Sequence, residues 1–105
     1  MPHSVTRVFH CTSAPAFENM PSYSERLIAR VGQLNTPALV GLDPRWEQLP
    51  AEVKEAAQSA GGSDAAIMAR GFESFCCEIV DIVAPLVPAV KPQVAFFEQL
   101  GPAGF

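Results

Sequence analysis

Two short apolar runs, each stopped by a charged residue and a proline, constrain the fold of this chain most strongly. The first run is Ala38–Leu42, which shows no polar alternation and ends at Asp43-Pro44. A short unbroken apolar run is typical of a strand buried on both faces of a parallel sheet. Proline cannot donate to a sheet ladder, so we expect Asp43 at the carboxyl end of this strand.

The second apolar run spans Val87–Val94 and has Ala89–Lys91 at its centre. It predicts another buried strand, and Pro92 marks where that strand ends. Lys91 therefore takes a position near the carboxyl end of its strand, as Asp43 does in the first run.

The sequence before the first run predicts an amphipathic helix. Ser22 and Glu25 have the spacing of a capping box, in which a hydroxyl and a carboxylate satisfy the free N–H groups at a helix start. The residues that follow recur at helical spacing and predict one apolar stripe, made of Leu27, Ile28, Val31 and Leu34.

The sequence between the two runs predicts two more helices. A short one covers Pro50–Ala60, and a longer one is capped by Ser63 and ended by Pro85. A further helix starts at Phe96–Leu100. The long helix has a broad apolar face, made of Ile67, Phe72, Phe75, Cys76, Ile79, Val80 and Val83.

This order of helices and strands indicates an α/β protein built from βα units with a parallel sheet. Two strands cannot close a sheet, so we expect residues 21–105 to form part of a larger domain. Residues 1–20 show no period, and we interpret them as a disordered tail or as sequence before the true start at Met20.

Composition excludes several classes of protein. The chain has 105 residues, of which 49% are hydrophobic, and a net charge of -4, which suits a globular protein and not a nucleic-acid binder. The most apolar stretch, Ile79–Val90, is interrupted by prolines and is too short to cross a membrane.

The cysteines and histidines predict no metal site and no disulfide framework. Cys11, Cys76 and Cys77 are odd in number and lack metal-ligand spacing, which favours small packed side chains in a reducing cytoplasm. His3 and His10 fall in the tail, where we expect no metal role.

Asp43 and Lys91 are the candidate binding residues, because sites in parallel α/β enzymes form at the carboxyl ends of the strands. A carboxylate there can accept hydrogen bonds from sugar hydroxyls, and an ammonium group can hold an anion. Alternatively, Asp43 caps a turn before Pro44, and Lys91 only reaches solvent. We expect Trp46, in the loop after the first strand, to pack on the rim of the folded domain and not to stack on a ligand.

Both strand ends resemble those of orotidine 5'-phosphate decarboxylases of the longer bacterial subfamily. The first strand is similar in the letters VGLDP at residues 40–44, followed by Leu49-Pro50. The second strand and the helix after it are similar in VKPQVAFFE at residues 90–98 and LGPAG at residues 100–104. The resemblance covers roughly residues 23–105, so it includes nearly all of the organised sequence.

The resemblance implies a TIM barrel, of which this chain would be an N-terminal fragment with about the first two βα units. The family converts orotidine 5'-phosphate to UMP and CO2 in pyrimidine biosynthesis, without a metal or an organic cofactor. By this resemblance, Asp43 would bind the substrate ribose, and Lys91 would join a network of Lys and Asp beneath it. The resemblance also implies a cytoplasmic homodimer.

The resemblance also implies that the proton-donating lysine lies beyond Phe105. In the family it belongs to an Asp-Ala-Lys-Arg-Gly-Asp type motif, which this sequence lacks, and Lys54 is the only lysine besides Lys91. We therefore expect no catalytic residue and no activity in the fragment alone. Two alternatives stay open: a complete small helical interaction module, and another phosphate-binding TIM barrel.

Overall fold

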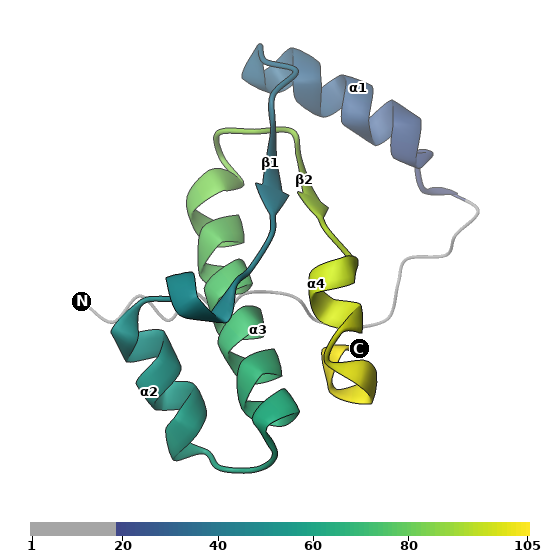
Figure 1. Cartoon of the computed structure of the whole chain (residues 1–105). Helices are drawn as coiled ribbons and strands as arrows, with labels where there is room; N and C mark the ends of the chain where they lie inside the picture. The colour runs from purple at the N-terminus through teal and green to yellow at the C-terminus, as the bar shows by residue number, and fades with distance from the viewer. Residues whose placement is uncertain (1–18) are drawn as a thin grey trace.

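The computed structural model describes residues 19–105, which form a two-stranded parallel sheet with helices at both ends and along one face (Figure 1). The predictions for His3, His10 and Cys11, and all but the last two residues of the tail predicted over residues 1–20, lie outside the described residues. The elements are, in order, α1 (Tyr23–Leu34), β1 (Leu39–Leu42), the 3₁₀ turn η2 (Trp46–Gln48), α2 (Ala51–Ser59), α3 (Asp64–Val83), β2 (Ala89–Pro92), α4 (Ala95–Glu98) and the 3₁₀ turn η3 (Gly101–Gly104).

Helix α1 begins at the predicted capping box. The backbone N–H of Glu25 donates to Ser22 Oγ at 3.2 Å, and the N–H of Ser22 donates to the Glu25 carboxylate at 2.8 Å. Asn35 ends the helix in the left-handed conformation, with φ of 53°. The predicted apolar stripe was wrong at one position: Ile28 is 72% exposed, because the sheet lies only against the side of α1 that carries Leu27 and Val31.

Helices α2 and α3 also form where the sequence predicts them. Pro50 directly precedes α2, and Gly61 and Gly62 end it with φ of 71° and 105°, values that glycine tolerates best. Ser63 caps α3 by accepting a hydrogen bond from the N–H of Ala66 at 3.2 Å. The two helices pack side by side in an antiparallel hairpin (Figure 1).

The two strands are parallel neighbours, as expected, and their register pairs Gly41 with Lys91 and Leu42 with Pro92. The second strand is shorter than the predicted Val87–Val94 and covers only Ala89–Pro92. The hydrogen bonding of the pair continues for one residue beyond the strands, because the N–H of Gln93 donates to the carbonyl of Leu42 at 3.1 Å.

The expectation that β1 is buried on both faces was wrong, because its burial alternates from residue to residue. Leu42 is 7% exposed and Pro44 is fully buried, whereas Leu39 is 55% exposed and Asp43 is exposed. Side chains alternate across a strand, so one face of the sheet packs on the helices and the other is open. Within residues 19–105, no helix covers the carboxyl half of this open face (Figure 1).

The hydrophobic core lies among the helices beyond the carboxyl ends of the strands. Phe72 of α3 is 1% exposed and stands at the centre of a buried cluster with Leu49, Val53 and Leu100. The Phe97 ring meets the Phe72 ring edge to face, with centroids 6.2 Å apart. This packing fixes the segments after both strands, η2 after β1 and α4 after β2, against one helix.

Helix α1 lies at the opposite, amino-terminal end of the sheet (Figure 1). The guanidinium group of Arg30, in α1, donates a hydrogen bond to the carbonyl of Ala84, just beyond the end of α3, at 2.8 Å. An apolar groove separates α1 from the open face of the strands and is lined by Leu27, Val31 and Leu39, among others. No helix in the part of the chain that the structure describes is long and apolar enough to span a bilayer.

Candidate functional site

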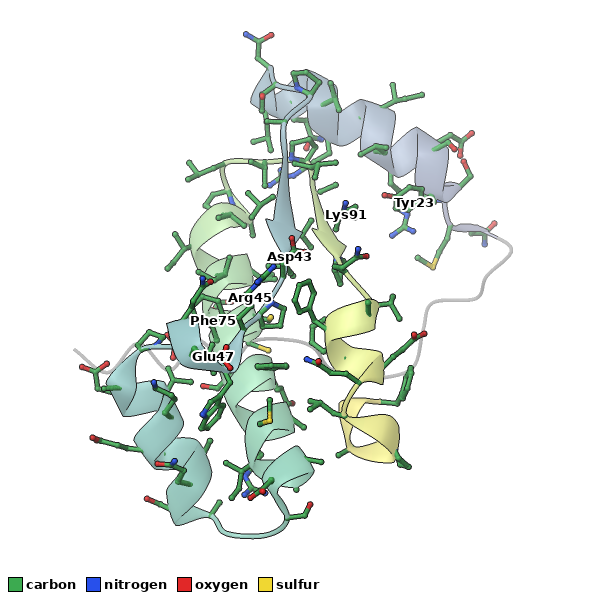
Figure 2. All side chains as sticks on the ribbon, viewed as in Figure 1. Tyr23, Asp43, Arg45, Glu47, Phe75 and Lys91 are labelled. Carbon is green, nitrogen blue, oxygen red and sulfur yellow. The ribbon has the colours of Figure 1, made fainter. Side chains whose placement is uncertain are left out.

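Asp43 and Lys91 lie at the same edge and on the same face of the sheet (Figure 2). Lys91 is in register with Gly41, and Asp43 follows Gly41 by two positions, so all three belong to the open face. Both charged side chains are exposed at the carboxyl ends of their strands. The structure therefore brings the two predicted residues together on one rim.

Gly41 makes room for the Asp43 carboxylate. A Cβ atom at position 41 would lie 3.8 Å from both carboxylate oxygens of Asp43, so the carboxylate folds back over the glycine. Sequence reasoning missed this role of Gly41. A glycine inside an apolar strand was the available signal, because it often marks a close approach.

Buried neighbours hold Asp43 in place from the other face. Leu42 and Pro44, the residues before and after it, both pack into the helical side of the sheet. Asp43 accepts no hydrogen bond and forms no ion pair within residues 19–105, so nothing supports the alternative that it caps a turn. Lys91 likewise has no side-chain partner among the described residues.

Arg45 is a second cation near this edge, and it was not among the predicted site residues. Its guanidinium carbon lies 5.3 Å from the centroid of the Phe96 ring, within the range of a cation–π contact. Figure 2 shows Arg45 beside Asp43, on the segment that leaves β1. The only local sequence feature that indicated a role for Arg45 was its position directly after Asp43-Pro44.

Several other candidates have structural roles. Trp46 packs against the core cluster, in agreement with the expectation that it is a packing residue. Lys54 lies on α2, on the helical side of the molecule, so it cannot replace a lysine at the open face. The described residues contain no group of three or more His, Cys, Asp or Glu side chains that could hold a metal ion.

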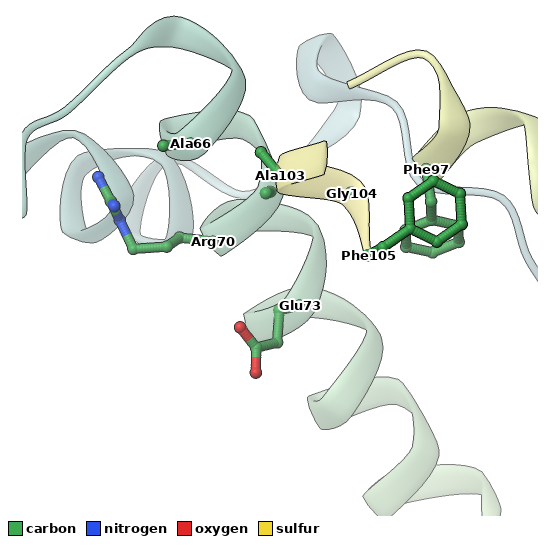
Figure 3. A pocket seen from close by; sticks show the side chains of 8 residues that line it. Ala66, Arg70, Glu73, Phe97, Ala103, Gly104 and Phe105 are labelled. Atoms are coloured by element: carbon green, nitrogen blue, oxygen red, sulfur yellow. The ribbon is translucent and has the colours of Figure 1, made fainter. Parts of the chain in front are cut away.

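A hollow of about 550 Å³ opens between α3 and η3, away from the strand ends (Figure 3). It is lined by Arg70, Glu73, Phe97 and Phe105, among others. Arg70 is already engaged, because its guanidinium donates to the carbonyls of Ala57, at 3.1 Å, and Gly61 at the end of α2. We assign the candidate site to the strand edge, where two unpaired opposite charges share one face.

The cysteines of α3 show how burial acts elsewhere in the molecule. Cys76 and Cys77 are half-buried free thiols, less enclosed than the sequence suggested. Burial raises the pKa of the Cys76 thiol, and the neighbouring Cys77 raises it further. Neither cysteine lies at the strand edge, so they take no part in the candidate site.

A parallel strand pair joined by helices, with an aspartate and a lysine at its carboxyl edge, defines an α/β protein. Comparison with known proteins shows which proteins the chain is similar to. The chain is 48% identical over 85 residues to an orotidine 5'-phosphate decarboxylase of Rhodopirellula baltica, an alignment that covers 81% of this chain and 27% of the relative.

Two further relatives carry the same name. The decarboxylase of Cupriavidus necator is 40% identical over 74% of this chain and 24% of its own length. That of Leptospira interrogans is 31% identical over 79% of this chain and 26% of its own length. The resemblance predicted from the strand-end motifs is therefore confirmed: the chain is related in sequence to orotidine 5'-phosphate decarboxylases.

The chain spans about a quarter of the length of the curated relatives that it matches, from 24% to 27% in these three. No family model matches it. No solved structure matches it either.

Proposed function

We propose that this chain supplies the ribose-binding edge of an orotidine 5'-phosphate decarboxylase, and that its two strands belong to a TIM barrel. The observation that carries the proposal is the placement of Asp43 and Lys91, from two matching motifs, on one face and one edge of neighbouring parallel strands. The relatives that share both stretches of sequence bear the name of that enzyme.

Each of the two residues has a distinct chemical task in this proposal. The Asp43 carboxylate accepts hydrogen bonds from the ribose hydroxyls, which positions the substrate over the open face. Lys91 contributes positive charge beneath the ribose and holds its carboxylate partners ionised where water is excluded. The reaction leaves a carbanion at the ring carbon that loses CO2, and preorganised charge stabilises such a centre most effectively.

The proton donor of the reaction has to come from outside this sequence. Lys54 is the only lysine besides Lys91, and it lies on the helical side of the molecule. A general acid acts only within hydrogen-bond reach of the reacting atom. We therefore propose that the 105-residue chain has no decarboxylase activity by itself, and that the active protein is a cytoplasmic homodimer of longer chains.

The two alternatives are less well supported. An independent helical module does not account for a parallel strand pair whose exposed face carries opposite charges at one end. Another phosphate-binding barrel does not account for the relatives described above, each of which is an orotidine 5'-phosphate decarboxylase by name. A decarboxylase segment explains both observations.

A chimera tests the proposal directly. The matching 85 residues of the Rhodopirellula baltica relative are replaced by those of this chain, and the decrease in orotidine 5'-phosphate absorbance is followed. We expect the chimera to turn over substrate, and the isolated chain to show none. Asp43→Ala and Lys91→Ala should each lower kcat/KM of the chimera by about a hundredfold or more.

Glu47→Gln is the matched control for this experiment, because Glu47 is an exposed carboxylate on η2 close to the same edge. It should leave kcat/KM within about twofold, as isolated exposed charges contribute little. A folded chimera without turnover, or a Lys91→Ala variant as active as its parent, would contradict the proposal.

A further inference from the structure

The contact between Arg45 and Phe96 joins the loop after β1 to α4, the helix that follows β2. Arg45 comes two positions after Asp43, and Phe96 lies in α4, the helix that follows Lys91. The guanidinium carbon is 5.3 Å from the ring centroid, close enough for electrostatic attraction to the ring face. The contact therefore spans the gap between the segments that carry the two candidate binding residues.

Two backbone hydrogen bonds complete this connection. The N–H of Gln93 donates to the carbonyl of Leu42 at 3.1 Å, and the N–H of Phe96 donates to the carbonyl of Gln93 at 3.2 Å. Asp43 thus lies between two cross-links to the same neighbouring segment: a hydrogen bond at position 42 before it and the cation–π contact at position 45 after it. Losing the second link would leave only the hydrogen bond at position 42 to join this segment directly to the segment after β2.

We infer that Arg45 is a positioning residue: through Phe96 it holds the loop after β1 against α4, the helix after β2, and so fixes Asp43 relative to Lys91. This inference rests on the proposed function, since it assigns Arg45 a task in forming the same ribose-binding edge. Arg45 acts through Phe96 and needs no contact with the ligand.

A second cation–π pair provides an internal comparison. The guanidinium carbon of Arg26 lies 5.9 Å from the Tyr23 ring centroid, but both residues belong to α1 and are three positions apart. A contact inside one helical turn cannot hold two loops together. Tyr23 lines the same groove as Lys91, but its contact with Arg26 stays within α1. Arg26 is therefore the matched control for Arg45.

The first experiment reads the contact itself in the 105-residue chain. The side-chain protons of Arg45 are assigned by NMR in the parent chain and in Phe96→Leu. Because the guanidinium lies over the ring, we expect ring-current shifts toward high field that disappear in Phe96→Leu and persist in Phe96→Tyr. Arg45 protons that do not respond to the loss of the ring would overturn the inference, whether or not the chain belongs to an active enzyme.

The second experiment reads the consequence in the chimeric decarboxylase, with UMP as the probe ligand. Arg45→Met and Phe96→Leu should each weaken UMP binding about two- to fivefold, the loss that an exposed cation–π contact gives. The double variant should be no weaker than either single one, because both remove the same link. Arg45→Lys, which keeps the cation, should recover most of the affinity, and Arg26→Met should leave it unchanged.

Three outcomes would overturn the inference. If Arg45→Met and Arg26→Met bind UMP equally well, the link does not position the site. If Arg45→Met weakens UMP binding more than tenfold while Phe96→Leu leaves it unchanged, Arg45 is a ligand contact. A folded parent chimera that neither turns over substrate nor binds UMP would overturn both the proposed function and this role of Arg45. The NMR experiment would still report on the contact between Arg45 and Phe96.

Discussion

The helical side of this molecule is stabilised by buried apolar side chains, whereas the open face of its sheet is exposed. On the helical side, Phe72 is 1% exposed and packs with Leu49, Val53 and Leu100. On the open face, Leu39 is 55% exposed, and the rim carries charge. The comparison shows that one strand can be fixed by packing on one face and still present a carboxylate on the other.

This separation explains how Asp43 can be exposed and yet well placed. Its neighbours Leu42 and Pro44 are buried in the helical side, so the backbone at Asp43 is held by apolar packing. The carboxylate itself has no partner within residues 19–105. Stability and the candidate chemistry therefore depend on different side chains of one short segment, which substitutions can tell apart.

The largest expected effect contrasts the centres of the two regions. Phe72→Ala removes the ring at the middle of the core and should lower the free energy of unfolding by about 3–5 kcal/mol. Leu39→Ala removes a side chain that is already half in water and should cost less than about 1 kcal/mol. Urea unfolding followed by circular dichroism measures both, and equal losses would contradict the division into two regions.

A pair of glycine substitutions should differ in sign. A Cβ at Gly71 of α3 would lie 2.9 Å from the Trp46 ring and 3.1 Å from Leu49, so Gly71→Ala should destabilise the chain by about 1–3 kcal/mol. Gly32 of α1 has open space around it, and Gly32→Ala should stabilise its helix by roughly 0.5–1 kcal/mol. Thermal unfolding of both variants measures the two shifts, and a stabilised Gly71→Ala would show that the η2 contact is loose.

The two serine caps test whether α1 and α3 unfold together. Ser22→Ala and Ser63→Ala each remove one hydrogen bond to a helix start, at a cost of about 1 kcal/mol. Because α3 carries the core, Ser63→Ala should lower the global stability, whereas Ser22→Ala should mainly speed amide exchange within α1. Hydrogen exchange resolved by residue measures this, and identical exchange profiles for both variants would indicate one cooperative unit.

The smallest expected effect concerns pH and Cys76 on the helical side. Burial raises the pKa of this thiol, so the folded chain should react with iodoacetamide more slowly than the urea-unfolded chain at mildly alkaline pH. The folded state binds the thiol proton more tightly than the unfolded state does. The contribution of Cys76 to the free energy of unfolding is therefore fully present at neutral pH and is lost as pH rises past the pKa of the unfolded thiol. A Cys11→Ser/Cys77→Ser variant isolates the signal, and equal rates in both states would contradict it.

Local sequence was sufficient to predict the elements and the candidate residues. The Ser22–Glu25 box, the Ser63 cap and the glycines after α2 all act within a few positions, so their effects can be inferred from spacing alone. The carboxyl-end positions of Asp43 and Lys91 followed from the prolines next to them. Their roles in binding stay predictions, which the chimera is designed to test.

Through-space features could not be predicted in the same way. The role of Gly41 depends on where the Asp43 carboxylate folds, and the Arg45–Phe96 contact joins segments that are far apart in the sequence. The exposed position of Ile28 depends on which side of α1 meets the sheet. Each of these needs the relative placement of two elements, and hydrophobic patterns within one element do not contain it.

The sequence by itself determined the order of the helices and strands and the caps of α1 and α3, and it placed an aspartate and a lysine at the ends of apolar runs, because caps, prolines and periodicity act locally. Only the tertiary structure decided that β1 has one buried and one open face, and that both charges share the open one. The physical reason is that a strand's faces become different only when a helix packs against one of them, and the parallel register then assigns each side chain to a side.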